Sequence, residues 1–427
     1  MTFASTNSYI GHAGKGYEYG VPWLTMAVLL VVMAFVSWRL VAPRLRRFTA
    51  EWDSVTVPDF LAVRFASRRV RIAAALVIAF SSLLYLIAIF KGAGNLFEAF
   101  LGVPYPAAVG ITLVIVMSYT SLGGFVSVVR TDVLQGVLMV IGALLLFGFV
   151  THAAGGVGVI RELDARPDTS HLTELNAAIP FVVLVGIALA GSLKLLVDPR
   201  QVTRFYGLRD ARSIRTGMWI AGIGILVVQF SLLPVGLYAR FLLDGVTDTD
   251  VVVPLLVTDR AVFPALVGDF LVVAIIAAAM SSLDSVLLVA ASVVVRDIRM
   301  ELGPLPERAA IAWTRWGVIG FAVVAAVVAL NPPGGIVEIT IFSGSLYAVC
   351  FIPTVVIALH WSRGSETAAL AAFGTGIAVL VGWLLLGWQA HLHEVFPALA
   401  ASTLVYIALA RLTPPVKDAR VAGFFGR

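Results

Sequence analysis

Residues 277–285 read Ala-Ala-Ala-Met-Ser-Ser-Leu-Asp-Ser and follow an apolar run over 271–276. In a helix, Ala278, Ser281 and Ser282 share one face. A main-chain carbonyl and two hydroxyls are neutral oxygen ligands, which suit a small monovalent cation better than a divalent one. The same pattern also suits close packing of small residues in lipid, with each serine bonding to its own helix. This stretch alone leaves both interpretations open.

The composition defines the class of protein. Apolar residues make up 60% of the chain and charged residues 13%, whereas soluble domains average about 45–50% and about 25%. With a mean hydropathy of +0.97, we expect an all-α integral membrane protein. The apolar runs are too long, and alternate too little, for barrel strands. Neither the net charge of +5 nor its distribution suggests a nucleic-acid partner.

The sequence shows no pattern typical of an enzyme or a metal centre. The single cysteine, Cys350, excludes an internal disulfide, and the six histidines are scattered. The chain has no glycine-rich phosphate-binding loop. We therefore expect no catalytic residues, no cofactor and no ATP-driven pump.

Apolar runs of about 20 residues, long enough to span a bilayer, recur along the chain. We predict about eleven full spans, together with a partial, polar and glycine-rich one over 1–19. The full spans are 21–41, 72–100, 105–122, 125–151, 176–197, 213–243, 264–295, 309–330, 336–360, 366–387 and 395–411.

Charge orients these spans. Most of the 30 Lys and Arg residues lie in alternate loops, including the arginine-rich 42–71 and a group that contains Lys194 and Arg200. Positive loops stay in the cytoplasm. We therefore expect a multi-pass protein of the plasma (inner) membrane with a cytoplasmic C-terminus, and with 152–175 and 244–263 outside.

Three segments interrupt the helical pattern. They are 1–20, the glycine pair 334–335 together with 341–345, and a predicted tight turn at 121–124. Irregular backbone at membrane depth is tolerated only where it is buried in protein or lines a cavity. In transporters, interrupted helices usually mark the binding site.

Three ordered blocks resemble the sodium:solute symporter family. They are Tyr-Thr-Ser-Leu-Gly-Gly-Phe at 119–125 with Arg-Thr-Asp-Val-Leu-Gln at 130–135, Met-Ser-Ser-Leu-Asp-Ser-Val-Leu-Leu at 280–288 with Asp297, and Pro-Asp-Phe-Leu at 58–61 with Arg64 and Phe65. The resemblance implies a fold of leucine-transporter type, with two inverted five-helix repeats and alternating access. It implies one transport domain over 1–427, with repeats at 1–151 and 176–360 and two extra C-terminal helices over 366–411. The first repeat would lack its start, so we expect an N-terminally incomplete transporter.

The resemblance also implies functional residues. A sodium ion would be held by the carbonyls of Ala4, Asn7 and Ala278 and the hydroxyls of Ser281 and Ser282. Asp132 would lie on the sodium exit path; it could equally be a helix-start cap or a partner for Arg130. By the geometry of the fold, we expect the solute near Asn7, Ser8, Gly11, Ser81, Tyr85, Phe342, Ser343 and Tyr347.

We therefore predict a sodium-coupled secondary symporter for a small organic solute, with the solute, sodium and the lipid bilayer as its partners. The alternatives are a proton-coupled carrier and a transporter-like sensor or receptor that does not transport. A channel would require a continuous polar path, which the spans do not show. Sugar-carrying members of the family have a carboxylate in the second core helix, but segment 21–38 has none. Thr6 stands where proline-type members have Asp, and Leu195 stands where both types have Tyr. The resemblance therefore implies neither sugar nor proline as the solute. The oligomeric state is left open.

Overall fold

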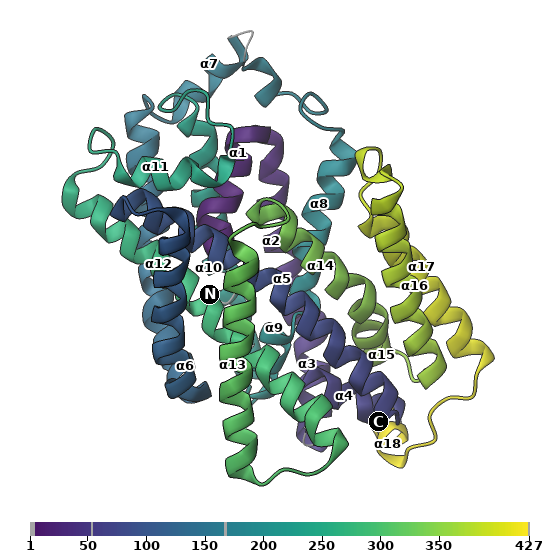
Figure 1. Cartoon of the computed structure of the whole chain (residues 1–427). Helices are drawn as coiled ribbons and strands as arrows, with labels where there is room; N and C mark the ends of the chain where they lie inside the picture. The colour runs from purple at the N-terminus through teal and green to yellow at the C-terminus, as the bar shows by residue number, and fades with distance from the viewer. Residues whose placement is uncertain (1–4, 53, 166–168, 426–427) are drawn as a thin grey trace.

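The computed structural model describes residues 5–52, 54–165 and 169–425, apart from the side chains of 119, 121–130 and 420. Within these ranges the regular elements are all helices (Figure 1). Ten of the described helices are long and apolar enough to span a membrane. They match ten of the predicted spans, and the eleventh, 105–122, corresponds to the shorter apolar stretch Tyr105–Ser118. The expectation of an all-α membrane protein is confirmed.

The principal helices, in chain order, are η1 (Asn7–His12), α1 (Ala13–Tyr19), α2 (Leu24–Val36), η3 (Ser37–Val41), α3 (Ala42–Trp52), α4 (Val57–Phe65), α5 (Arg68–Leu101), α6 (Tyr105–Ala153), α7 (Ile160–Ala165), α8 (Phe181–Leu193), η6 (Lys194–Leu196), α9 (Pro199–Tyr206), α10 (Ala211–Ala239), η7 (Thr249–Val251), α11 (Val252–Thr258), α12 (Ala265–Val293), η8 (Val294–Arg299), α13 (Glu307–Ala329), α14 (Ile336–Phe351), η10 (Ile352–Ile357), α15 (Ala358–His360), α16 (Glu366–Leu385), α17 (Val395–Leu412) and α18 (Ala419–Phe425).

At three places where the sequence predicts an interrupted helix, the structure is helical. The helix α6 runs through the predicted tight turn at 121–124, and α14 is continuous through 341–345. Within the predicted interruption over 1–20, residues 7–12 form a π-helical turn. A membrane helix satisfies its own backbone groups, so Gly and Ser are tolerated inside it where neighbouring helices pack closely. The true interruption after α14 is the π-helical η10, where Pro353 cannot donate a main-chain hydrogen bond.

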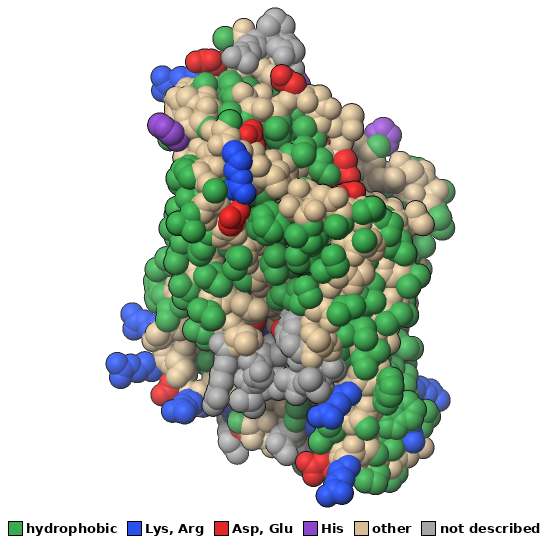
Figure 2. All heavy atoms as spheres, turned by 60° about the vertical axis from the view of Figure 1, so that its left-hand side comes forward, with side chains coloured by type: hydrophobic (Ala, Val, Ile, Leu, Met, Phe, Trp, Pro, Cys, Tyr) green, Lys and Arg blue, Asp and Glu red, His purple; other side chains and the backbone are tan. Residues whose placement is uncertain are grey.

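Burial separates central helices from peripheral ones. In their most apolar 18 residues, the span Ile336–His360, which contains α14, is 83% buried and the span Ala265–Leu302, which contains α12, is 78% buried, against 22% for α13. The surface therefore shows an apolar band, with charged side chains gathered above and below it (Figure 2). This pattern is that of a protein seated in a bilayer. It places α12 and α14 where a binding site can be shielded from lipid.

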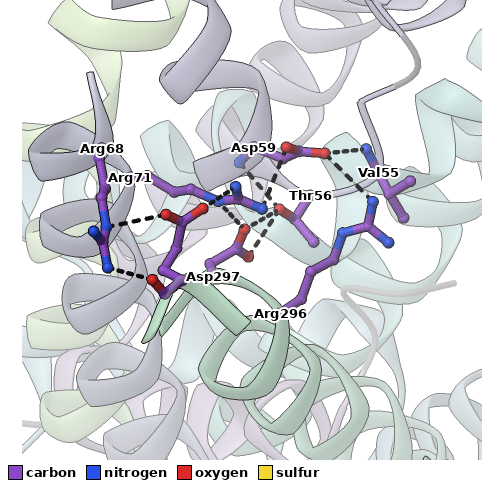
Figure 3. A network of polar contacts seen from close by, with 8 residues as sticks. Val55, Thr56, Asp59, Arg68, Arg71, Arg296 and Asp297 are labelled. Carbon is purple, nitrogen blue, oxygen red and sulfur yellow. Dashed lines mark hydrogen bonds and ion pairs between the residues drawn. The ribbon is translucent and has the colours of Figure 1, made fainter. Parts of the chain in front are cut away.

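A buried carboxylate ties three elements together at the end of the molecule that holds the C-terminus (Figures 1 and 3). Asp297 of η8 accepts hydrogen bonds from Thr56 Oγ1 at 2.8 Å and from Arg71 Nε at 2.8 Å. Arg71 also pairs with Asp59 at 3.4 Å and with Glu301. Thr56 caps α4 by accepting from the Asp59 amide. Two of the blocks that resemble the family, around Asp59 and Asp297, therefore meet in this network.

Candidate functional site

The predicted cation face is buried on α12. Ala278, Ser281 and Ser282 are 0%, 4% and 2% exposed. Ser282 Oγ is buried without a hydrogen-bond partner among the described residues. An unpaired buried hydroxyl costs free energy that a bound cation would recover, since its oxygen can act as a ligand. Ala4, another predicted ligand, lies outside the described residues.

The hydroxyl of Ser281 is oriented by Asp132. Ser281 Oγ donates to Asp132 Oδ1 at 2.5 Å, and Asp132 Oδ2 pairs with Arg204 Nη2 at 2.6 Å. A serine that gives its proton to a carboxylate turns its lone pairs elsewhere, so its oxygen remains available to a cation. Asp132 lies inside α6, so the expectation of a helix-start cap is wrong. Its ion-pair partner in the described structure is Arg204 of α9, and the side chain of Arg130 is not described.

The turn η1 approaches α12 across α6. A side-chain carbon placed at Gly142 would lie 2.6 Å from Ala274 Cβ and 3.0 Å from Tyr9 Oη. Tyr9 also donates to the Met139 carbonyl of α6. Ala274 is one helical turn before Ala278, so the Tyr9 side chain of η1 reaches to within about one turn of the predicted cation face.

A small central cavity lies where η1, α2, α5, α8, α10 and α14 meet. Its volume is about 20 Å³, which is room for about one water molecule. The cavity is lined by Ser5, Asn7, His12, Leu30, Tyr85, Gly191, Lys194, Gln229 and Ile341. Six of these nine residues are polar. Small-molecule sites usually measure about 300–1,000 Å³, so the cavity has to widen before a solute can enter it.

The predicted solute residues fall into three groups. Asn7 and Tyr85 line the central cavity. Four others form hydrogen bonds between neighbouring elements: Gln229 donates to Ser8, Ser343 to the Ser81 carbonyl, and Ser82 and Tyr347 share a bond. The remaining two are not among the lining residues. A side-chain carbon at Gly11 would lie 2.5 Å from Asn7 Oδ1, so Gly11 lies next to a lining residue, whereas Phe342 packs in a separate apolar cluster.

The most informative lining residue was missed from the sequence. Lys194, assigned there to a cytoplasmic loop, is instead 8% exposed in η6, and Arg200 is 6% exposed. The loop assignment of this pair was wrong because the charge count ignored that Lys194 falls inside the predicted span 176–197. An ionisable residue inside an apolar span is itself a signal of function.

The two buried cations differ in their partners. Arg200 binds Asp198 through Nε at 3.0 Å and Nη2 at 2.6 Å. In the part of the chain that the structure describes, Lys194 Nζ has no carboxylate or hydrogen-bond partner and lies 5.3 Å from the centre of the Tyr85 ring. A cation over an aromatic face gains about 0.5–2 kcal/mol. A charge at the centre of a membrane helix costs about 2.5–3.5 kcal/mol or more, so the ring alone does not offset the burial of an ammonium.

A wider vestibule lies at the end of the molecule that holds α1 and α11 (Figure 1), with a volume of about 600 Å³. Lys15 Nζ is 2.6 Å from both Glu18 and Glu338, and Lys91 Nζ is 2.6 Å from Asp250. Burial raises the pKa of Asp250, and the neighbouring Lys91 opposes that rise. Both lysines of the vestibule are therefore neutralised by carboxylates.

Solved structures with this helix arrangement identify the fold. A substrate-bound, outward-open Na⁺-coupled sialic acid symporter superposes with a TM-score of 0.78 at 17% identity, over 97% of this chain and 89% of that one. The inward-facing conformation of Mhp1 gives a TM-score of 0.61 at 11% identity, over 99% and 92%. The fold is that of leucine-transporter-type secondary transporters.

Sequence comparison then identifies the family. The model of the sodium:solute symporter family matches residues 1–376, and the chain belongs to this family. It is 29% identical to the osmoregulated proline transporter OpuE of Bacillus subtilis, over 95% of this chain and 84% of the relative. It is 23% identical to the sodium/pantothenate symporter of Haemophilus influenzae, over 95% and 85%. The predicted family, fold and membrane-transport class are confirmed.

Proposed function

We propose that this protein carries a small organic solute across the cell membrane, driven by sodium, and that the sodium ion binds the α12 face. The observation that carries the proposal is the buried pair Ser281 and Ser282. One hydroxyl is turned by Asp132, and the other is unpaired among the described residues. Each charge moving inward gains about 2.3 kcal/mol per 100 mV of membrane potential.

The remaining sodium ligands in this proposal are the main-chain carbonyls of Ala4, Asn7 and Ala278. The approach of η1 to α12 through Tyr9 and Ala274 supports this arrangement. Asp132 lies beside Ser281, where it can receive the ion on its way out. Arg204 would then have to release Asp132 when sodium leaves.

The solute in this proposal binds beside Asn7 and Tyr85, where alternating access has to widen the central cavity from about 20 Å³. Alternating access moves the two repeats, 1–151 and 176–360, against each other, and the helices of 366–411 flank them. Names of relatives supply candidate solutes, proline and pantothenate.

The orientation can be tested by labelling. We propose that 42–71 faces the cytoplasm with the C-terminus and that 152–175 faces outside. In a Cys350→Ser background, an impermeant maleimide applied to intact cells should label Leu175→Cys and spare Arg46→Cys. Labelling of position 46 from outside would reverse the orientation.

Transport can be tested with purified protein in liposomes. Uptake of radiolabelled proline and pantothenate is measured under an inward sodium gradient, under a choline gradient, and under a proton gradient without sodium. Uptake that needs sodium supports the proposal. Uptake driven by protons alone would make the protein a proton-coupled carrier, and sodium-dependent binding without uptake would make it a sensor.

A further inference from the structure

We propose that the transported solute is an organic anion whose carboxylate pairs with the ammonium of Lys194 in the central cavity. This inference rests on the proposed symport function and adds the charge class of the solute. It follows from three features of the cavity, which are the position of Lys194, the neighbouring charges and the unpaired acceptors.

The fold aims Lys194 at the cavity. The residue begins the short 3-10 turn η6, which continues α8 directly. A side-chain carbon at Gly344 of α14 would lie 3.3 Å from Lys194 Cδ. The absence of a side chain at Gly344 therefore leaves room for the lysine stem. Its Nζ then faces the cavity beside the Tyr85 ring.

The surrounding charges sum to a positive site. Asp198 is already bound by Arg200 at two nitrogen atoms, and the guanidinium of Arg200 lies 4.3 Å from the centre of the Tyr85 ring. That pair is neutral overall, so Lys194 contributes an excess positive charge among the described lining residues. A sodium ion on α12 would add a second one. A carboxylate is the solute group that offsets this charge.

The cavity lining also offers hydrogen-bond acceptors. Asn7 Oδ1 and Gln229 Oε1 are buried without hydrogen-bond partners in the described part of the chain. Neutral amide oxygens suit the O–H or N–H donors of a hydroxyl or amide, whereas an ammonium would favour a carboxylate. The geometry therefore favours a net anion carrying hydroxyl or amide groups over a zwitterion.

The first experiment compares matched solutes in wild-type liposomes under a sodium methanesulfonate gradient. The first set is the carboxylate L-lactate, its neutral amide lactamide and the zwitterion L-alanine. The second set is the carboxylate pantothenate and its neutral alcohol panthenol. Proline is a further zwitterion. We expect sodium-dependent uptake of at least one carboxylate, at least 100-fold faster than uptake of its neutral or zwitterionic partner.

Several outcomes would overturn the inference. The first is that a neutral or zwitterionic member is taken up as fast as its carboxylate partner, or faster. The second is that no carboxylate is taken up although ²²Na⁺ still binds. The third is that chloride alone has the same effect as the carboxylate solute. Absence of ²²Na⁺ binding and of all sodium-dependent uptake would instead contradict the proposed symport function. The two failures are therefore distinguishable.

The second experiment removes the charge. Lys194→Met keeps the length of the side chain and should lower carboxylate uptake at least 100-fold, while uptake of the neutral partner is unchanged or rises. The matched control is Lys417→Met, because Lys417 is exposed on the surface; this variant should transport as wild type. Unchanged carboxylate uptake by a folded Lys194→Met protein would contradict the assignment, and if that variant does not fold, the wild-type solute panel still decides.

Discussion

The vestibule and the central cavity both contain lysines, but only the vestibule neutralises them. Lys15 and Lys91 each lie 2.6 Å from a carboxylate oxygen, in a space of about 600 Å³. Lys194 has no such partner among the described residues, in a space of about 20 Å³. Charges in a wide, wet space are screened by water, whereas a charge in a closed one needs a specific partner.

The difference assigns separate roles to the two regions. In the vestibule, the ion pairs fix the positions of α1, α5 and α14 around the opening. In the central cavity, the ammonium of Lys194 has no carboxylate beside it among the described residues, so its charge is offset only by what binds there. Substitutions should therefore be tolerated better in the vestibule than around the central cavity.

The largest effect should come from separating the helices that build both regions. A side-chain carbon at Gly236 of α10 would lie 1.7 Å from the Ala13 carbonyl oxygen of α1. Gly236→Ala must therefore push α1 away, which we expect to cost about 5 kcal/mol or more. Fluorescence-detected size-exclusion chromatography should show loss of folded protein.

Gly374→Ala is the matched control, since nothing lies within 4 Å of a carbon placed there. That variant should be as stable as wild type. A folded, transporting Gly236→Ala protein would show that the packing of α1 on α10 is not required by either region.

The next effect should come from removing the carboxylate that pairs with Arg200, the buried cation on the Tyr85 ring. Asp198→Asn leaves Arg200 buried without its counter-ion, and breaking a buried ion pair typically costs about 3–5 kcal/mol. We expect a large drop in thermal stability and loss of sodium-driven uptake. Wild-type stability and uptake in this variant would show that Arg200 does not depend on Asp198.

A moderate effect is expected at the cation face. Ser282→Ala removes one proposed ligand without adding bulk, so the sodium concentration for half-maximal uptake should rise about tenfold, equivalent to about 1.4 kcal/mol. Expression should be unchanged. If sodium dependence and uptake both stay normal, Ser282 serves close helix packing and does not bind the ion.

The smallest effect should come from the vestibule. Glu338→Gln removes one partner of Lys15, but the Glu338 side chain is 51% exposed and Glu18 remains at 2.6 Å. Exposed ion pairs contribute about 1 kcal/mol or less. Uptake should change by about twofold at most, and a loss as large as that of Asp198→Asn would remove the distinction between the two regions.

Local sequence patterns were enough for the class of protein and for part of the site. The apolar runs predicted the spans, because a helix needs about 20 apolar residues to cross a bilayer. The spacing of Ala278, Ser281 and Ser282 placed them on one face, because the helical period is fixed by backbone geometry. The resemblance of three blocks to a known family added the fold and the coupling ion.

Tertiary structure decided the partners and the exceptions. Asp132 meets Arg204 of α9, and the stem of Lys194 enters space left by Gly344 of α14. Neither contact follows from spacing along the chain, because each joins helices whose relative positions depend on packing. The same packing keeps α14 helical through 341–345, where the sequence alone predicted an interruption. Charge counting placed Lys194 in a loop although it falls inside the predicted span 176–197, but the groups around its ammonium were decided by the neighbouring helices.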